Sequence, residues 1–237
     1  MEDIIVEQQA IKNYKNSKPW PDNDEWHKYT YTILKKYVQD WLIRNTTARM
    51  LILNAGCGNT TYNTPAEIIY MDIVEDYISS FKQYIVGSVE KIPLEDHSID
   101  GIICVGSVLN YVDAQKTISE FSRILKPQGF LILEFERTKS AEFLFTPEYK
   151  KTIFLKRYHY NGQEHFLWMY NERFIIQLLE YYNLKLKTKY RFHCISSLLY
   201  RIGFQEKNIA KYSKWDSFLQ IFSYPIAHNV ILNLTKN

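Results

Sequence analysis

Short runs of apolar residues, each ended by glycine or by polar residues, alternate with amphipathic stretches over the first 136 residues. The clearest run, Met50–Leu53, leads through Asn54 and Ala55 into Gly56 and Gly58. A continuous apolar run that ends at glycine is typical of a buried parallel strand. Similar runs recur along the chain, and we expect strands over residues 49–54, 68–72, 84–87, 99–105 and 130–136.

The stretches before and between these runs have helical spacing. It predicts helices over residues 3–16, 24–45, 74–82 and 113–125. In the second of them, apolar residues recur three and four positions apart and form a largely aromatic stripe on one helix face: Trp26, Tyr29, Ile33, Tyr37 and Trp41. Such a stripe is typical of a helix that faces the core, and its place directly before the first strand also allows a lid.

The alternation of strands and helices stops after the fifth strand. Residues 152–160 and 164–170 flank Asn161-Gly162, a strong signal for a two-residue hairpin turn. The remaining elements are a helix over 171–182, a strand with one wet face over 184–192, and a closing strand over 228–234.

Together these elements predict an α/β fold, with a doubly wound, mostly parallel seven-stranded sheet and helices on both faces. Only residues 59–67 separate the first glycine turn from the second strand, which is too little for a full crossover helix. We expect a single domain with four parts: an N-terminal helical cap (1–45), a core (49–136), a hairpin insertion or lid (137–170) and a C-terminal part of the sheet (171–237).

Composition adds a few exclusions. Hydrophobic residues make up 46% and charged residues 23% of the 237, which is ordinary for a soluble protein. Cys57, Cys104 and Cys194 are widely spaced, so neither a disulfide framework nor a metal site is expected. The acidic start of the chain lacks the features of a signal peptide, and no apolar run approaches the ~18 residues of a membrane span. We therefore expect a cytoplasmic protein without a membrane partner.

Charge is distributed unevenly along the chain. Residues 1–149 hold 15 basic and 21 acidic residues, a net charge of −6, whereas residues 150–237 hold 14 and 5, a net charge of +9. The basic part could attract an anionic partner or simply balance the acidic half. Lys185, Lys187, Lys189 and Arg191 alternate along one expected strand, a pattern that fits a phosphate contact or a solvated edge strand. The overall charge is too mild to demand nucleic acid.

Candidate chemistry lies where the first two strands end. Gly56 and Gly58 let the backbone turn sharply and let a ligand lie against it. Asp72 ends the second strand, where an acid can accept both ribose hydroxyls of a nucleoside cofactor. Because ligands of doubly wound sheets bind beyond the carboxyl ends of the strands, the three residues predict a nucleotide-type site there.

Further motifs follow in order, and with them the sequence resembles class I S-adenosylmethionine-dependent methyltransferases. The resemblance spans roughly residues 49–136 and is carried by residues 54–59, 70–72, 87–94, 98–100, 105–112 and 123–131. It departs from the family pattern at three positions. Asn54 stands where an acid is usual, Thr60 where a third glycine is usual, and Ser88 where an aspartate is usual.

The resemblance implies S-adenosyl-L-methionine as cofactor and a role for each matching position. Gly56, Cys57 and Gly58, preceded by Asn54, would lie under its methionine part. Asp72 would hold the ribose, and Ile73 would pack on the adenine. The remaining cofactor residues would border the adenine edge or floor the site near the sulfonium: Ser88, Val89, Val105, Gly106 and Ser107.

The implied reaction is methyl transfer to oxygen or nitrogen of a small-molecule acceptor. A hydroxyl acceptor would need a general base. The strand ends offer Glu136, Asn110 and Tyr111 as catalytic candidates, and the hairpin offers His159 and His165 if it folds over the cleft. The motifs of DNA amino-methylating and cytosine C5 enzymes do not follow the fourth strand. The insertions at 1–45 and 138–170 are aromatic and lie where the family builds substrate caps, so we favour a small molecule such as a sugar or another metabolite.

Two other classes of function stay open at this point. A nicotinamide-dependent oxidoreductase would use the same crevice, but Thr61 stands where its third glycine would fall. A binding protein without activity on the same scaffold is the other alternative, because a fold does not guarantee a function.

Overall fold

The computed structural model describes residues 2–15, 17, 20, 24–160, 163–204, 212 and 224–237. Its centre is a seven-stranded sheet with the order β3-β2-β1-β4-β5-β9-β8. The strands β1 to β5 pair in parallel, and β9 is antiparallel to both of its neighbours. The predicted α/β class and mostly parallel sheet are confirmed. The strands are β1 (Leu51–Ala55), β2 (Glu67–Asp72), β3 (Tyr84–Val86), β4 (Ile99–Cys104), β5 (Leu125–Glu136), β8 (Leu184–Phe192) and β9 (Asn229–Lys236).

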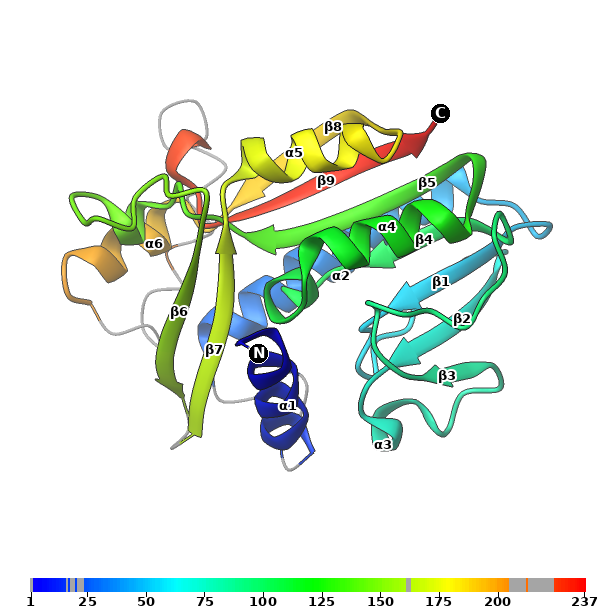
Figure 1. Cartoon of the computed structure of the whole chain (residues 1–237), viewed down its shortest axis with the longest axis horizontal. Coiled ribbons are helices and arrows are strands. Elements are labelled where there is room, and N and C mark those ends of the chain that lie inside the picture. The colour runs from blue at the N-terminus through cyan, green and yellow to red at the C-terminus, as the bar shows by residue number, and fades with distance from the viewer. Residues whose placement is uncertain are drawn as a thin grey trace.

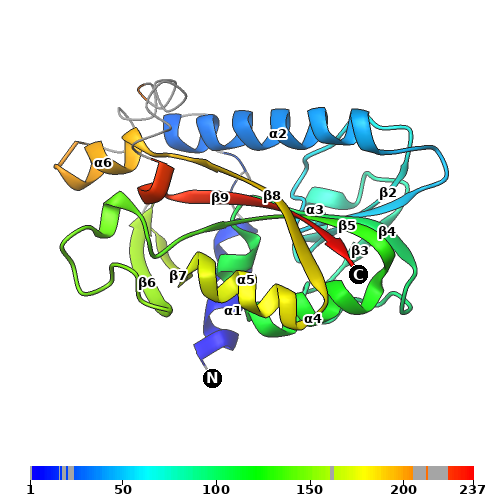
Figure 2. The ribbon, with the colours of Figure 1, turned by 90° about the horizontal axis from the view of Figure 1, so that it is seen from above.

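Helices cover both faces of this sheet (Figure 2). One face is covered by α2 (Glu25–Asn45), and the other by α4 (Ala114–Ile124) and α5 (Glu172–Tyr181). The long helix begins where Asp24 caps it, because the aspartate side chain accepts hydrogen bonds from the N–H groups of the first turn. None of the helices in the described ranges is long and apolar enough to cross a bilayer.

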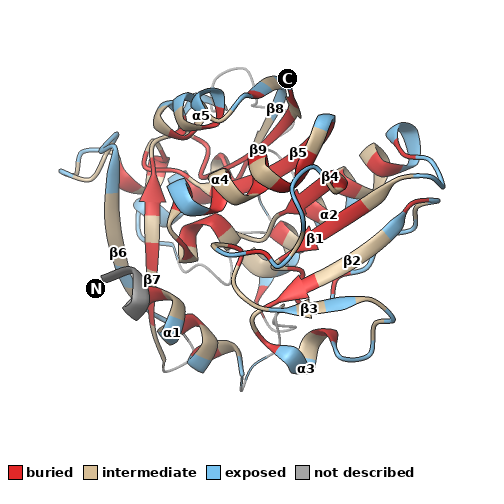
Figure 3. Ribbon diagram, turned by 45° about the vertical axis from the view of Figure 1, so that its right-hand side comes forward, coloured by how far each residue is buried: buried red, intermediate tan, exposed pale blue. Residues whose placement is uncertain are grey.

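The contact between α2 and the sheet forms a core of its own. Fully buried Leu34, Val38 and Leu42 pack with strand residues that include Ile103 and Ile132. The residues of the predicted aromatic stripe are half-buried and lie beside these three leucine and valine side chains. The helix face that points into the core is therefore the one centred on Leu34, Val38 and Leu42, one residue along the chain from the stripe. The central strands are buried and the edge strand β3 is largely exposed (Figure 3).

The connection from β1 to β2 has no crossover helix. All of residues 56–66 are described, and none of them is helical. Tyr62 and Ala66 from this connection instead pack into the core under α2. The sequence prediction of a curtailed crossover is therefore correct, and α2 covers the strands that a crossover helix would otherwise cover.

Two element boundaries differ from the prediction. The helix expected over 74–82 is only α3 (Glu75–Ile78), because the chain then turns to stack Phe81 on Tyr70 of β2, with ring centroids 3.8 Å apart. The fifth strand begins at Leu125 rather than near residue 130. Gln128 adopts a positive φ of 65°, and the register with β4 shifts there, so the Lys-Pro-Gln-Gly turn is an irregularity within the strand.

The predicted hairpin is confirmed as β6 (Ile153–Tyr160) and β7 (Gln163–Tyr170), while its turn residues lie outside the described residues. It stands beside the main sheet, and α1 (Glu2–Tyr14) packs against β7 (Figure 1). Asn13 of α1 donates a hydrogen bond to the carbonyl of Glu164, 2.8 Å away. The break expected over residues 18–24 lies mostly outside the described residues.

The C-terminal part contains the predicted edge strand β8 and closing strand β9, with α6 (Ile195–Arg201) between them. Two of the four alternating basic residues are not simply solvated. Lys189 and Arg191 form ion pairs with Glu172, at 3.2 and 2.5 Å, and fully buried Arg137 also pairs with this carboxylate. The basic side chains of β8 therefore help to hold the first residue of α5 in place through these ion pairs.

The fold makes the packing of α2 testable by stability. Leu42→Ala should lower the free energy of unfolding by ~2–5 kcal/mol, because it opens a cavity under a helix that covers a whole sheet face. The neighbouring Ile43 is 60% exposed, so Ile43→Ala should change it by less than ~0.5 kcal/mol. Urea denaturation of both variants measures the difference, and equal losses would contradict this packing.

Candidate functional site

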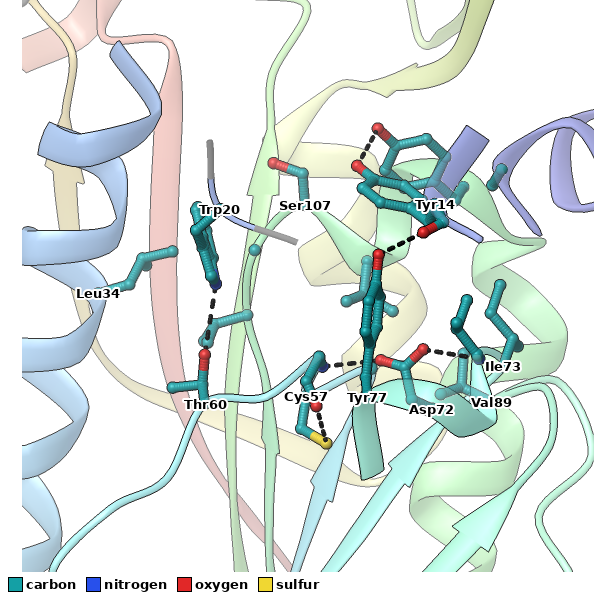
Figure 4. Close-up of a pocket in the computed structure, with 18 of the residues that line it drawn as sticks. Tyr14, Trp20, Leu34, Cys57, Thr60, Asp72, Ile73, Tyr77, Val89 and Ser107 are labelled. Atoms are coloured by element: carbon teal, nitrogen blue, oxygen red, sulfur yellow. Dashed lines mark hydrogen bonds between the residues drawn. The ribbon is translucent and has the colours of Figure 1, made fainter. Parts of the chain in front are cut away.

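A deep pocket opens at the carboxyl ends of the parallel strands. It encloses about 1370 Å³, part of it open to solvent. Residues that follow β1, β2, β3 and β4 form one side, and residues of α1, α2 and the hairpin form the other. Figure 4 shows the two sides facing each other, with Trp20 and Leu34 opposite Asp72 and Ile73.

The structure brings nearly all predicted site residues to this pocket. All eleven residues predicted for the cofactor line it. Of the three catalytic candidates, Glu136 and Tyr111 line it as well. Asn110 is fully buried and is not among the described lining residues, because its amide is used within the fold. Its Nδ2 donates to the carbonyls of Glu136 and Trp168, and its Oδ1 accepts from the N–H of Glu136.

The turn after β1 is tightly constrained at Gly56. Its φ is 65°, and a Cβ there would lie 2.4 Å from Cγ2 of Val108. Only glycine fits both the backbone conformation and the space. The turn is closed on its other side by Asn54, whose Nδ2 donates to the carbonyl of Thr60, 3.0 Å away. The unusual asparagine therefore has a structural task, which is to hold a loop that replaces the first turn of a crossover helix.

Asp72 joins this loop to the end of β2. Its Oδ2 accepts from the N–H of Gly58 at 2.7 Å, and its Oδ1 accepts from the N–H of Val74 at 3.0 Å. Burial raises the pKa of this carboxyl, while the backbone hydrogen bonds from Val74 and Gly58 lower it. A backbone hydrogen bond from Ile73 lowers this pKa as well, and because a carboxylate can accept about four hydrogen bonds, Asp72 keeps acceptor capacity at the pocket that it lines.

The floor of the pocket, formed by residues after β4, is held in place by a buried glutamate that was not predicted from the sequence. Gly106 and Ser107 adopt positive φ values of 91° and 59°. The N–H groups of both donate to Oε2 of Glu134 at 2.8 Å, and its Oε1 accepts from Nδ2 of Asn229 at 2.7 Å. Burial raises the pKa of Glu134 to about 7. A charged residue within the apolar run of β5 is the signal that points to it.

Glu136, two residues further on, has the opposite electrostatic environment. Burial would raise its pKa, but the charge and hydrogen bond of His228 and the charge of Lys156 outweigh that effect and lower it to about 2. His228 Nε2 lies 3.0 Å from Oε2 of Glu136, and Ser107 Oγ donates to its Oε1 at 3.1 Å. Glu136 is thus an ionised group beside the floor of the pocket, and a weak base.

Tyrosine side chains close the side of the pocket under α1. The hydroxyls of Tyr14 and Tyr111 are 3.0 Å apart, and burial raises the pKa of both. Tyr158 of the hairpin also lines the pocket. The Tyr77 hydroxyl donates to the carbonyls of Tyr14 and Ser17, which ties the N-terminal segment to the residues after β2 (Figure 4).

The two hairpin histidines lie elsewhere. His159 is exposed beside Glu164, and His165 is buried and stacks on Tyr158, with ring centroids 5.1 Å apart. Neither is among the described residues that line the pocket. The imidazole on the pocket wall is His27 of α2, whose Nδ1 lies 2.9 Å from Oδ2 of Asp24.

Further aromatic walls come from the N-terminal segment and were not predicted individually. Trp20 lies against the floor, where a Cβ on Gly106 would be 3.2 Å from its ring, and its Nε1 donates to Thr60 Oγ1 at 3.3 Å. Trp26 stacks on buried His193, with ring centroids 3.8 Å apart. The periodicity of α2 identifies its aromatic face, but only the fold shows that one end of that face reaches the pocket.

Comparison with known proteins agrees with this geometry. Residues 53–133 match the family model of the methyltransferase domain. An uncharacterised methyltransferase from Schizosaccharomyces pombe is 32% identical over 135 residues, which are 52% of this chain and 49% of the fungal protein. The chain spans about half the length, or less, of the curated relatives it matches.

Solved structures resemble the chain over most of its length. A protein from Listeria monocytogenes, described as an S-adenosylmethionine-dependent methyltransferase, superimposes with a TM-score of 0.61 at 12% identity, covering 89% of this chain and 99% of that one. The 1,6-didemethyltoxoflavin-N1-methyltransferase of Burkholderia thailandensis gives 0.56 at 11% identity, with 100% and 89% coverage. These likenesses establish a shared fold.

The buried Glu134 should make stability depend on pH. Its pKa is about 7 in the folded chain against an ordinary 4.5, so between these values the unfolded chain loses a proton that the folded chain keeps. Stability should therefore fall as pH rises through this window, by on the order of 3 kcal/mol in total. Glu134→Gln should lack this component. Urea unfolding from pH 4.5 to 8 measures it, and parallel pH profiles for the two proteins would contradict the assignment.

Proposed function

We propose that this chain is a class I, S-adenosylmethionine-dependent methyltransferase that transfers the methyl group of S-adenosyl-L-methionine to a small-molecule acceptor, since residues 53–133 match the family model of the methyltransferase domain. One observation carries the proposal. The eleven residues that the family resemblance assigns to the cofactor all line a single pocket, at the strand ends where ligands of such sheets bind.

The residues present fit the cofactor. Asp72 keeps acceptor capacity for the ribose hydroxyls, and Ile73 and Val89 beside it offer apolar surface to the adenine. Gly56 lines the pocket, and its missing side chain leaves the room that Val108 of the floor occupies. When bound, the cofactor supplies an activated methyl group on a sulfonium. Ser88 would border the adenine edge, and Val105, Gly106 and Ser107 would floor the sulfonium end.

The protein's contribution is mainly to position the acceptor and to exclude water. Holding two reactants in line can supply a large part of the rate enhancement of a displacement. Glu134 fixes the floor through two backbone N–H groups, and Tyr14 and Tyr111 close the pocket from the α1 side. Glu136 stays ionised close to the floor, where its charge can orient an acceptor.

A small acceptor fits the enclosure better than a macromolecule. The acceptor side is bounded by α1, α2 and the hairpin, and aromatic rings form much of it. The Burkholderia protein of the same fold is named for a small heterocyclic substrate, and a Streptomyces coelicolor relative in structure for geranyl diphosphate. We propose an acceptor of similar size for the present chain, and we assign neither of these two substrates to it.

Asp72→Ala should weaken S-adenosylhomocysteine binding by ~100-fold or more, because it removes the acceptors for both ribose hydroxyls. Asp76→Ala changes a nearby exposed aspartate of α3 and should leave the affinity unchanged. Calorimetric titration measures both, with circular dichroism to confirm folding.

The same titrations with S-adenosylmethionine and NAD separate the alternatives. Binding of the two adenosyl ligands, lost in Asp72→Ala, supports the proposal. Binding of NAD alone would assign the pocket to a nicotinamide-dependent oxidoreductase. Adenosyl binding without turnover of any acceptor would favour a binding protein on this scaffold, and unchanged affinity in Asp72→Ala would refute the site assignment.

A further inference from the structure

Two hydrogen-bond acceptors stand side by side at the carboxyl end of β5 and the start of β9. Glu136 and Asn229 are direct partners in the antiparallel register, so their side chains lie on the same face of the sheet with Cβ atoms ~5 Å apart. Both residues line the pocket. The face is that of α2, since Ile132 and Ile231 of the same strands pack in the core under this helix.

Asn229 presents an acceptor whose partner is missing. Its side chain is 2% exposed, and its Nδ2 donates to the Glu134 carboxylate at 2.7 Å. Once Glu134 is ionised, its carboxylate requires the amide nitrogen on its side, so Oδ1 is turned away from it. This Oδ1 is buried and has no hydrogen-bond partner among the described residues. A buried polar atom without a partner is costly, and at a pocket wall it indicates a group that a ligand satisfies.

Glu136 adds charge to the same place. The described residues give it one hydrogen bond on each oxygen, from Ser107 and His228. Two of the four acceptor positions of a carboxylate therefore stay free. Because Ser107 belongs to the floor proposed for the sulfonium end, Glu136 lies next to where the methyl group would be transferred.

We propose that the acceptor of this enzyme is a primary amine, bound through its two N–H groups by Glu136 and by Oδ1 of Asn229. The inference rests on the proposed function and names its substrate class. An amine nitrogen offers two donors to two acceptors, whereas a hydroxyl offers one. The aromatic walls formed by Trp20, Tyr14 and Tyr111 suit a nitrogen that becomes positive.

The chemistry balances without a general base. The lone pair of a neutral amine forms the new N–C bond while the C–S bond breaks. The electron pair of the C–S bond stays on sulfur, which becomes the sulfur of a neutral thioether. The positive charge passes to nitrogen, where the Glu136 carboxylate stabilises it, and the proton is later lost to water. Glu136 is too weak a base to activate a hydroxyl, and this transfer does not require it to be stronger.

The test uses amines paired with alcohols of the same skeleton. Benzylamine and benzyl alcohol, 2-phenylethylamine and 2-phenylethanol, and tyramine and tyrosol are assayed with radiolabelled S-adenosylmethionine between pH 7 and 9.5. At least one amine should show a kcat/KM at least tenfold above that of its alcohol. This kcat/KM should rise with pH as the amine loses its proton, since only the neutral form attacks.

Variants locate the effect. Asn229→Ala and Glu136→Gln should each lower kcat/KM for the amine at least tenfold. S-adenosylhomocysteine affinity is measured for both, because Asn229 also contacts Glu134 and Glu136 also contacts Ser107 of the floor, and a fall in kcat/KM no larger than the fall in this affinity would contradict a contact with the acceptor.

Asn233→Ala is the matched control. Asn233 lies on the same strand and face and also has an Oδ1 without a partner among the described residues, but its Nδ2 contacts Tyr37 and Thr188. It should affect neither measurement.

Several outcomes would overturn the inference. Preferred turnover of an alcohol, lost in His27→Gln, would assign a hydroxyl acceptor with His27 beside Asp24 as its base. If the protein binds S-adenosylhomocysteine but methylates none of the amines, the amine as acceptor class is refuted and the proposed function is not affected. Failure to bind S-adenosylhomocysteine at all would refute the proposed function, and the inference with it.

Discussion

The short connection between β1 and β2 is the constraint on which the rest of the arrangement depends. Eleven residues, 56–66, must carry the chain from one parallel strand to the next, which is fewer than a crossover with a helix requires. The face of β1 and β4 that a crossover helix would bury therefore needs another cover. The helix α2 supplies it with Leu34, Val38 and Leu42, and it reaches the sheet from the N-terminal side of the chain.

This substitution explains the shape of the site. Because α2 must lie along the sheet with its first turn at the carboxyl ends of the strands, Trp26, His27 and Thr30 reach the pocket. The segment before it brings Trp20 and Tyr14 against the same opening. Tyr77 and Tyr111 form hydrogen bonds with Tyr14, and Trp20 donates one to Thr60. The same missing helix leaves the loop after Gly56 without helical hydrogen bonds, and Asn54 and Asp72 hold it instead.

Local sequence patterns predicted the sheet, the two-faced helix cover and the hairpin, because each depends on residues that are neighbours in the chain. They also selected Gly56 and Asp72, which lie at strand ends and line the pocket. The patterns could not identify Glu134 or Asn229 as partners, since β9 follows β5 only after a long stretch of chain and their contact depends on register. Asn110 was misplaced for the same reason, because its partners in β5 and β7 are distant in sequence.

The strand order also bears on how the two halves of the pocket come into being. The residues that we propose for the cofactor all lie within the contiguous segment 54–107, so this half of the pocket can form while the rest of the chain is still being synthesised. The other half draws on both ends of the chain, since β9 inserts between β5 and β8 and α1 docks on the hairpin. Contacts of such high sequence separation form slowly. We therefore expect a nascent chain to form the half of the pocket proposed for the cofactor first and the half proposed for the acceptor last.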